Sequence, residues 1–270
     1  MPGAINIMNL ASKAVHKVGF ISPPSWFDIS PMEFSRIAPS NTIVMQTVMR
    51  PPDFDYSPEQ FADAVQELKA CFDSLAAAGA DVVTQFGYPF SLVHGWKKAQ
   101  QIQKRIQGNS NVSFVMMGVE MIQALKHLHC SSLAVASTYY SGKMSEILRR
   151  YLAEAGLDVL QFENWVSQGI ASGTESDVFV GEGELDPMDW KTPKHAVKQS
   201  VISISRKSPE ADCILVTGGG MRLLNIVEDL ESEVNKPVIS GDLILYWGIL
   251  RRLGIREGIE RQGKLLASLP

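Results

Sequence analysis

A chain of 270 residues, of which 45% are hydrophobic and 20% charged, has the composition of an ordinary globular protein with a sizeable core. Its 29 acidic and 25 basic residues leave a net charge of -4, and no basic tract exceeds a short pair such as Lys97 and Lys98, which argues against a nucleic-acid partner. No apolar stretch approaches the ~20 residues of a membrane span, and residues 1–17 lack the pattern of a signal peptide, so we expect a cytoplasmic protein without membrane attachment.

Apolar, β-rich segments alternate with helical patterns along the chain, which is typical of βαβ units and a mainly parallel sheet. The expected strands are 18–21, 43–49, 82–85, 113–117, 133–136, 159–163, 213–216 and 238–240. Between the second and third of them, Ser57 as cap and Pro58 at the first helical position predict a helix that continues to Ala78. Asp242 is expected to cap the last long helix, and residues 166–192 are expected to form irregular loops.

The two halves of the chain resemble each other. In each half a helix leads to an Ala-Asp step, a strand and a glycine, at residues 80–87 and again at residues 211–218. Two lobes related by a pseudo-twofold axis would bring Gly87 and Gly218 to one cleft, because ligands bind outside the carboxyl ends of parallel strands. The predicted fold is therefore α/β, with two pseudosymmetric lobes that each hold a mainly parallel sheet flanked by helices. The expected boundaries are a tail over 1–17, lobe 1 over 18–128 and 243–270, and lobe 2 over 129–242.

Three consecutive glycines, Gly218, Gly219 and Gly220, follow the strand 213–216 and precede a helical pattern that starts at Met221. Glycines let a ligand approach the backbone closely, and the free N–H groups at a helix N-terminus favour negative charge. The segment is expected to bind a small anion. Its spacing matches neither a dinucleotide site nor a P-loop, so nucleotide binding is not predicted.

The cysteines and histidines show no metal-binding pattern. Cys71, Cys130 and Cys213 are widely spaced and are expected to be buried and free. His127 and His129 fall on different sides of a helix, so no metal site is predicted.

The sequence resembles the aspartate/glutamate racemase superfamily, and within it the arylmalonate decarboxylase and maleate isomerase branch. The similarity lies in residues 85–87 and 217–220, in residues 136–140 after the central strand, and in Pro23 and Pro24 after the first strand. It covers residues 18–254 approximately. It implies two pseudosymmetric lobes, no cofactor, and carboxylate substrates that lose an α-proton or an α-carboxyl group to give an enolate-like intermediate.

The chain departs from this family at the strand tips. Racemases and maleate isomerases of the superfamily resemble one another in having a cysteine at each tip, and the decarboxylase keeps only the second, whereas this chain has Gly87 and Gly218. Tyr88 and Pro89 stand where decarboxylase-like members have hydroxyls that hold a carboxylate. Glycine supplies neither a nucleophile nor an acid or base, so cysteine-dependent turnover is not expected. Tyr140, which matches the anion-holding tyrosine of the family, is retained.

Four residues are candidates to replace the missing thiols. Tyr140 and Tyr88 can donate to an enolate oxygen, His94 can act as a base near neutral pH, and Asp242 can place a carboxylate in the cleft. His94 also fits a surface position at a helix start, and Asp242 also fits a helix cap. The candidate substrate-binding residues are Pro24, Gly87, Thr138, Thr217, Gly218, Gly219 and Gly220.

Aromatic residues flank two of the expected strand tips, namely Trp26, Phe27, Phe86, Tyr88 and Phe90. They fit either the wall of an apolar pocket or the core beneath a loop. If they line the cleft, the ligand has a bulky apolar part.

Three functions stay open at this point. The leading hypothesis is a cofactor-independent decarboxylase, lyase or isomerase that acts on a small carboxylate or carbonyl substrate through an enolate-like intermediate, without a cysteine nucleophile. The second is a carboxylate-binding or regulatory protein that has lost catalysis. The third is a hydratase or hydrolase whose water is activated by His94 or Asp242. The expected partner is a small-molecule carboxylate, and the sequence leaves open whether the chain forms a homo-oligomer.

Overall fold

The computed structural model describes residues 16–26, 28–51, 53–140, 142–172, 192–219 and 221–270. Within these ranges, eight strands form two separate four-stranded sheets in which all paired strands are parallel. The first sheet has the order β2-β1-β3-β4 and contains β1 (His16–Ser22), β2 (Thr42–Val48), β3 (Val82–Gln85) and β4 (Ser113–Met116). The second has the matching order β6-β5-β7-β8 and contains β5 (Ser132–Ser137), β6 (Asp158–Asn164), β7 (Cys213–Thr217) and β8 (Val238–Ser240). The predicted fold class is confirmed.

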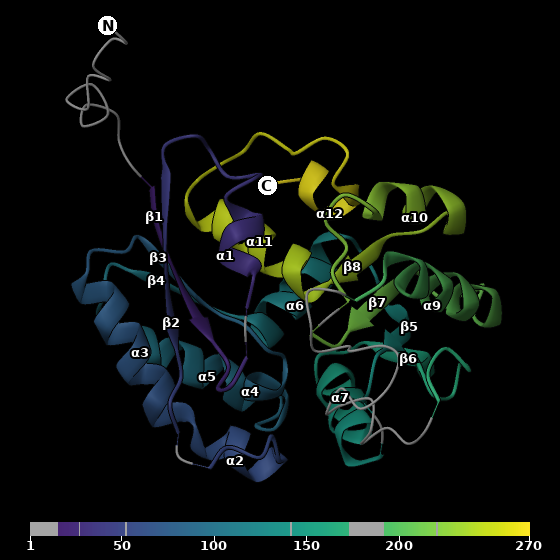
Figure 1. Cartoon of the computed structure of the whole chain (residues 1–270), viewed down its shortest axis with the longest axis horizontal. Helices are drawn as coiled ribbons and strands as arrows, with labels where there is room; N and C mark the ends of the chain where they lie inside the picture. The colour runs from purple at the N-terminus through teal and green to yellow at the C-terminus, as the bar shows by residue number, and fades with distance from the viewer. Residues whose placement is uncertain (1–15, 27, 52, 141, 173–191, 220) are drawn as a thin grey trace, which may run out of the picture.

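Helices flank both sheets (Figure 1). On the first sheet, α3 (Val65–Ala77) contacts β1, β2 and β3, and α5 (Trp96–Gln107) contacts β4. On the second, α9 (Lys194–Lys207) contacts β5, β6 and β7, α7 (Gly142–Glu154) contacts β6, and α10 (Val227–Val234) contacts β8. The other helices of the described ranges are α1 (Ser30–Phe34), α2 (Pro58–Asp63), α4 (Pro89–Leu92), α6 (Met117–His127), α11 (Gly241–Arg252) and α12 (Gly263–Ala267).

The helix α11 joins the two lobes. It lies with α6 between the sheets (Figure 1) and contacts β3 and β4 of the first sheet as well as β8 of the second. Every residue from Asp242 to Leu250 is buried, as expected for a helix that is apolar on nearly all sides. At its end, Arg251 and Arg252 form ion pairs with the fully buried carboxylate of Glu120 on α6. Since α12 contacts α10 and β8, the assignment of 243–270 to lobe 1 stays a prediction.

The repeat seen in the sequence has a hydrogen-bonding role in both lobes. Before β3, the carboxylate of Asp81 accepts the backbone N–H of Lys17 on the neighbouring strand at 2.8 Å. Before β7, the carboxylate of Asp212 accepts the N–H groups of Ser131 and Ser132 at 2.9 Å each and the hydroxyl of Ser131 at 2.8 Å. Each aspartate therefore ties the start of its own strand to the start of the central strand of its sheet.

We expect Asp212→Asn to lower stability in a pH-dependent way. The backbone and hydroxyl donors of Ser131 and Ser132 lower the pKa of the folded Asp212 carboxyl from 3.8 to about 2. A lowered folded pKa contributes stability that is fully present above the unfolded pKa and is lost as the pH falls through the folded value. The difference between wild type and variant should therefore be largest above pH 4 and shrink between pH 3.8 and 2, as measured by urea unfolding. Asp63→Asn, at an exposed position of α2, is the control, and a difference that persists unchanged to pH 2 contradicts the assignment.

The predicted strands are confirmed, whereas some of the predicted helices differ in the structure. All eight expected strands are present with ends shifted by at most two residues. The helix predicted from Ser57 to Ala78 is divided into α2 and α3 at Ala64, and Ser57 caps it by accepting the backbone N–H of Gln60 at 3.3 Å. Residues 166–172 are irregular as expected, whereas 173–191 and the tail over 1–15 lie outside the described residues.

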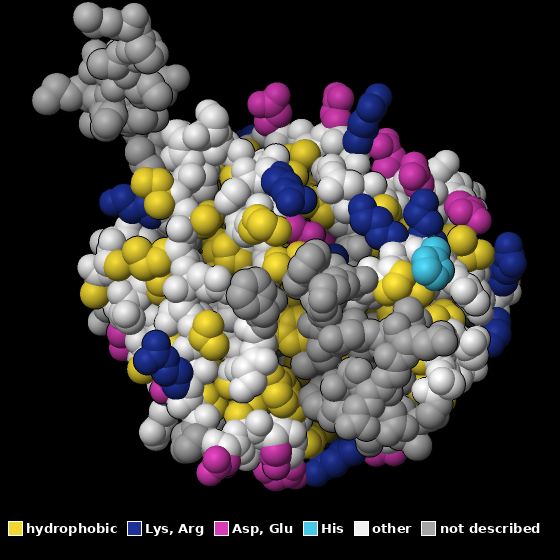
Figure 2. Space-filling model, viewed as in Figure 1, with side chains coloured by type: hydrophobic (Ala, Val, Ile, Leu, Met, Phe, Trp, Pro, Cys, Tyr) yellow, Lys and Arg dark blue, Asp and Glu magenta, His cyan; other side chains and the backbone are white. Residues whose placement is uncertain are grey.

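Two surface properties complete the description. No helix among the described residues has the length and apolar character needed to cross a membrane. Lysine and arginine side chains are scattered over the face shown in Figure 2 and do not merge into one basic area there.

Candidate active site

A cavity of about 540 Å³ lies at the carboxyl ends of strands from both sheets. Gly87 after β3 and Gly218 after β7 both line it, as the internal repeat predicts. Loops that follow β1, β2 and β5 contribute further lining residues, and so does the start of α11. The cavity therefore occupies the position at which ligands bind in open parallel sheets.

The two glycines have the same backbone conformation. The φ angles of Gly87 and Gly218 are 109° and 107°, a region that residues with a side chain rarely adopt. A Cβ atom on Gly218 would lie only 1.9 Å from Oγ1 of Thr138. Both the backbone and Thr138 therefore require glycine at this tip. Thr138, predicted to bind substrate, is fully buried behind Gly218 and does not line the cavity.

The predicted anion site on the glycine turn is not formed as expected. Residues 221–226 are not helical, and α10 begins only at Val227, so no helix N-terminus follows the glycines. A Cβ atom on Gly219 would lie 2.2 Å from Cη2 of Trp26, which therefore covers this residue, and the backbone N–H of Gly219 hydrogen-bonds the hydroxyl of Tyr139. Gly219 lines the cavity, but its polar group is already engaged. Gly220 lies outside the described residues.

The carboxylate of Asp242 binds the segment that follows the glycines. Its carboxylate accepts the backbone N–H groups of Leu223 at 3.1 Å and Leu224 at 3.3 Å, which holds this segment in a turn, and it also accepts the hydroxyl of Ser240. The prediction that Asp242 caps α11 is wrong, because Ser240 occupies the cap position and Asp242 lies inside the first turn. Asp242 nevertheless lines the cavity, with an exposed fraction of 2%.

Of the two tyrosine candidates, Tyr140 is the better placed. Tyr140 lines the cavity, and its backbone is fixed because its N–H donates to Oγ of Ser137 at 3.0 Å and its carbonyl accepts Nδ2 of Asn164 at 3.2 Å. Burial, followed by the neighbouring Tyr139 and Tyr88, raises the pKa of Tyr140 well above its ordinary value. Its hydroxyl therefore stays protonated and can act as a hydrogen-bond donor.

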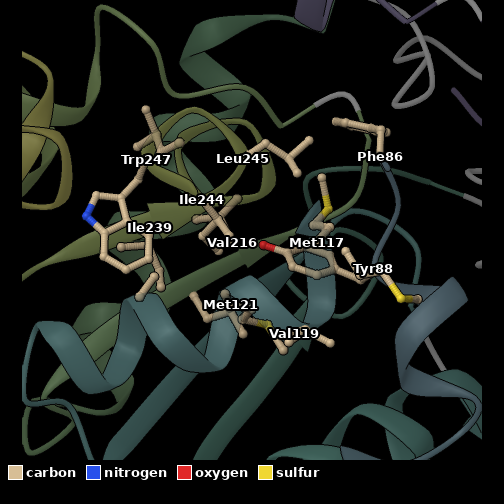
Figure 3. Close-up of a cluster of buried hydrophobic side chains, with 14 of the residues drawn as sticks. Phe86, Tyr88, Met117, Val119, Met121, Val216, Ile239, Ile244, Leu245 and Trp247 are labelled. Carbon is tan, nitrogen blue, oxygen red and sulfur yellow. The ribbon is translucent and has the colours of Figure 1, made fainter. Parts of the chain in front are cut away.

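Tyr88 lines the same cavity but directs its hydroxyl elsewhere. Figure 3 shows the ring among apolar side chains of both lobes, including Met117 and Val216, with the hydroxyl oxygen turned into this cluster. This buried oxygen has no hydrogen-bond partner among the described residues. Burial, with smaller contributions from Asp242 and Cys213, raises the pKa of Tyr88 well above its ordinary value.

The other predicted site residues lie outside the lining. His94, expected as a base in the cleft, is half-buried between α4 and α5, and burial, then Lys98 and Arg105, lower its pKa. Thr217 is buried at the end of β7. Pro24 is buried next to the lining residue Pro23, and its carbonyl accepts the hydroxyl of Tyr56. None of these three residues lines the cavity.

Aromatic side chains form much of the cavity wall, which is the first of the two arrangements that the sequence left open. The aromatic lining residues are Trp26, Tyr56, Phe61, Phe86, Tyr88, Phe90, Tyr139 and Tyr140. Trp26 stacks on Phe86 with ring centroids 6.2 Å apart, and Phe61 meets Phe90 edge to face at 4.8 Å. Phe27 lies outside the described residues. Such a wall suits a ligand with a bulky apolar part.

The family follows from a match over most of the chain. A family model described as arylmalonate decarboxylase matches residues 18–176 and 184–266. The chain belongs to the arylmalonate decarboxylase family. The superfamily branch expected from the sequence is thereby confirmed. The curated arylmalonate decarboxylase of Bordetella bronchiseptica is 21% identical over 241 residues, which cover 88% of this chain and 90% of that protein.

Solved structures of this family and of maleate isomerases share the fold. A crystal structure of arylmalonate decarboxylase has a TM-score of 0.73 at 17% identity and covers 93% of this chain and 99% of its own. A variant of the Nocardia farcinica maleate cis-trans isomerase with a covalently bound succinylcysteine intermediate has a TM-score of 0.74 at 19% identity, covering 94% of this chain and 99% of its own. The maleate isomerase of Pseudomonas putida S16 has a TM-score of 0.74 at 17% identity, covering 95% and 100%.

In this member of the arylmalonate decarboxylase family, none of the three cysteines lines the cavity. Cys213, the one on β7, precedes Gly218 by five residues, which corresponds to roughly 16 Å along an extended strand. It is fully buried, and burial, then its neighbour Cys130, raise the pKa of its thiol well above the ordinary value. Among the described residues, no group of three His, Cys, Asp or Glu side chains is arranged to hold a metal.

The described lining also contains two cationic side chains that were not among the predicted site residues, Lys143 and Arg222. Lys143 lies at the start of α7 and forms an exposed ion pair with Glu59 of α2. Arg222 lies in the turn after the three glycines and is largely buried. Their positions directly after the strand tips of β5 and β7 are the signal that could have identified them.

Proposed function

We propose that this member of the arylmalonate decarboxylase family is an enzyme that acts on a small carboxylate or carbonyl substrate through an enolate-like intermediate, without a cysteine nucleophile. The supporting observation is one cavity at the strand tips of both sheets that is lined by Gly87, Gly218 and Tyr140 but by none of the three cysteines. Decarboxylase, lyase and isomerase chemistry all remain within this proposal, and the site favours the first.

The wall of the cavity suggests the substrate class. Eight aromatic residues supply apolar surface, and Lys143 and Arg222 supply positive charge. An acid with a bulky apolar substituent on its α-carbon would bury that substituent against the rings and place its carboxylate near a cation. We therefore propose substituted malonates, or carboxylates of similar shape, as substrates.

Decarboxylation suits a site without a free base. The bond between the α-carbon and one carboxylate breaks, carbon dioxide leaves, and the electron pair that remains forms the enolate. The neutral hydroxyl of Tyr140 donates a hydrogen bond to the enolate oxygen, and a proton that originates from water then restores the α-carbon. No base is needed to start this sequence. Abstraction of an α-proton would need one, and the carboxylate of Asp242 is already engaged with Leu223, Leu224 and Ser240.

A binding or regulatory protein is the second candidate. It is favoured by the glycine turn itself, where Thr138 fills the space behind Gly218 and Trp26 covers Gly219. A chain that had lost turnover could keep the aromatic wall and the cations. The hydratase or hydrolase candidate has less support, because His94 lies outside the lining.

Incubation of the purified protein with a substrate panel tests the proposal. The panel contains malonates with aryl and alkyl substituents, maleate, hydroxy acids and amino acids, in deuterated water, followed by NMR and mass spectrometry. We expect a bulky malonate to lose carbon dioxide and to give a product with solvent deuterium on the α-carbon. Tight carboxylate binding with no reaction of any panel member favours the binding protein. Incorporation of oxygen-18 from labelled water into the product indicates hydratase or hydrolase chemistry instead.

A further inference from the structure

Arg222 brings a fixed guanidinium to the cavity. Its Nε donates to the carboxylate of Glu33 at 2.6 Å, and its Nη2 donates to the hydroxyls of Tyr246 at 2.8 Å and Ser30 at 3.1 Å. The hydroxyl of Tyr246 in turn donates to Glu33 at 3.0 Å, which closes the network. With an exposed side-chain fraction of only 10%, the guanidinium is held in one orientation by α1 and α11.

One donor nitrogen of this guanidinium is unused. Among the described residues, Nη1 of Arg222 has no hydrogen-bond partner. The fully buried polar atoms without a partner do not include it, so Nη1 retains some exposure. The guanidinium carbon lies 5.8 Å from the ring centroid of Phe86, which stacks on Trp26 in the cavity wall. Arg222 and both rings line the cavity, so the available donor belongs to a residue of its wall.

The surrounding charges keep Arg222 cationic. Burial disfavours the charged form, but Tyr246, Asp242, Glu33 and Asp28 outweigh it and raise the pKa of Arg222 above its ordinary value. Of the three nearby carboxylates, only Glu33 binds the guanidinium directly. Asp28 accepts hydrogen bonds from Ser22 and Ser30, and Asp242 accepts those of the turn described above. None of them occupies Nη1.

We propose that Arg222 is the residue that recognises the carboxylate of the ligand, through Nη1, and thereby fixes its orientation in the cavity. A guanidinium held by its other nitrogens is suited to this role, because little side-chain freedom is lost on binding. The carboxylate lies beside Phe86 and Trp26, and the apolar part of the ligand extends toward Phe61 and Phe90. The inference rests on the proposed carboxylate specificity but does not require turnover.

A pair of unreactive probes tests this assignment. Phenylacetate and phenylacetamide share size and shape but differ in charge, so calorimetric titration of both isolates recognition of the carboxylate. We expect the wild type to bind phenylacetate about tenfold to a hundredfold more tightly than the amide. Arg222→Gln should remove most of this preference while leaving the affinity for the amide nearly unchanged. Lys69→Gln, at an exposed position of α3 outside the described lining, is the control and should keep the preference. Lys143→Gln, which removes a second cation from the described lining, should reduce the preference much less than Arg222→Gln.

Folding of the variants is checked by thermal unfolding, since Arg222 also joins α1 and α11. If Arg222→Gln does not fold, a structure of the wild type with phenylacetate decides, with the carboxylate expected within hydrogen-bond distance of Nη1. Equal affinity of the wild type for both probes, no measurable binding of phenylacetate, or a carboxylate bound away from Arg222 overturns the inference. Loss of the preference in Arg222→Gln without turnover of any substrate supports it and counts only against the proposed enzyme.

Discussion

Tyr140→Phe is expected to lower kcat by about 10²- to 10³-fold with little change in KM for the substrate that the panel identifies. In the proposed reaction the hydroxyl of Tyr140, a lining residue, donates to the enolate oxygen, and negative charge develops on that oxygen only as carbon dioxide leaves. The removed interaction is therefore stronger in the transition state than in the ground state. Steady-state kinetics of both proteins provide the measurement.

The neighbouring residue supplies a matched control. Tyr139 lines the same cavity and packs on Tyr140 with ring centroids 5.3 Å apart, but its hydroxyl is engaged with the backbone of Gly219. Tyr139→Phe should therefore reduce kcat far less than Tyr140→Phe. Because the pKa of Tyr140 is raised well above its ordinary value, ionisation of this residue should not lower wild-type activity between pH 7 and pH 9. Turnover that survives intact in Tyr140→Phe shows that another group stabilises the intermediate.

Gly218→Cys is expected to destabilise the fold rather than to restore cysteine chemistry. A side chain at a φ of 107° costs about 1–3 kcal/mol of backbone strain. The overlap with Oγ1 of Thr138, 1.9 Å from an ideal Cβ, adds about 1–3 kcal/mol of overpacking. The free energy of unfolding, from urea denaturation, should therefore fall by about 2–6 kcal/mol.

Gly87→Cys separates the two contributions. Its φ of 109° gives the same strain, but the closest atoms to its Cβ are ring carbons of Phe90 at 3.3 Å. The loss of stability should be smaller than in Gly218→Cys, and Thr138→Ala combined with Gly218→Cys should recover part of the difference. If Gly218→Cys is as stable as the wild type, the backbone conformation and Thr138 do not require glycine at position 218.

The fold could be predicted because its signals are local. Apolar runs located all eight strands, and the Ala-Asp steps at Asp81 and Asp212 indicated the repeat that the hydrogen bonds of both lobes confirm. The site depended on contacts between distant segments. The helix expected after Gly220 is instead a non-helical segment over 221–226, and its Leu223 and Leu224 N–H groups donate to Asp242, which follows a later strand.

The difference between local signals and long-range contacts also explains which site residues could be predicted and which were missed. Gly87, Gly218 and Tyr140 directly follow strands, so their place at the cavity could be inferred from order along the chain. The exclusion of His94 depends on how α4 and α5 pack, and the role proposed for Arg222 depends on Glu33 and Tyr246 from opposite ends of the chain. The position of Arg222 after a strand tip was available as a signal, but neither packing arrangement leaves a pattern in neighbouring residues.

The position of α11 limits how a ligand reaches the cavity. Its first turn carries Gly241 and Asp242 in the lining, while its last turn is anchored to the buried Glu120 through two arginines. Swinging the lobes apart like a hinge would have to expose this helix or break that anchor, and both are costly. We expect ligand entry to involve instead the loops that carry Trp26 and Tyr56 in the first lobe. The hydroxyl of Tyr56 donates to the carbonyl of Pro24, which links these two loops. Both sheets and α11 can then stay fixed while only these two loops move.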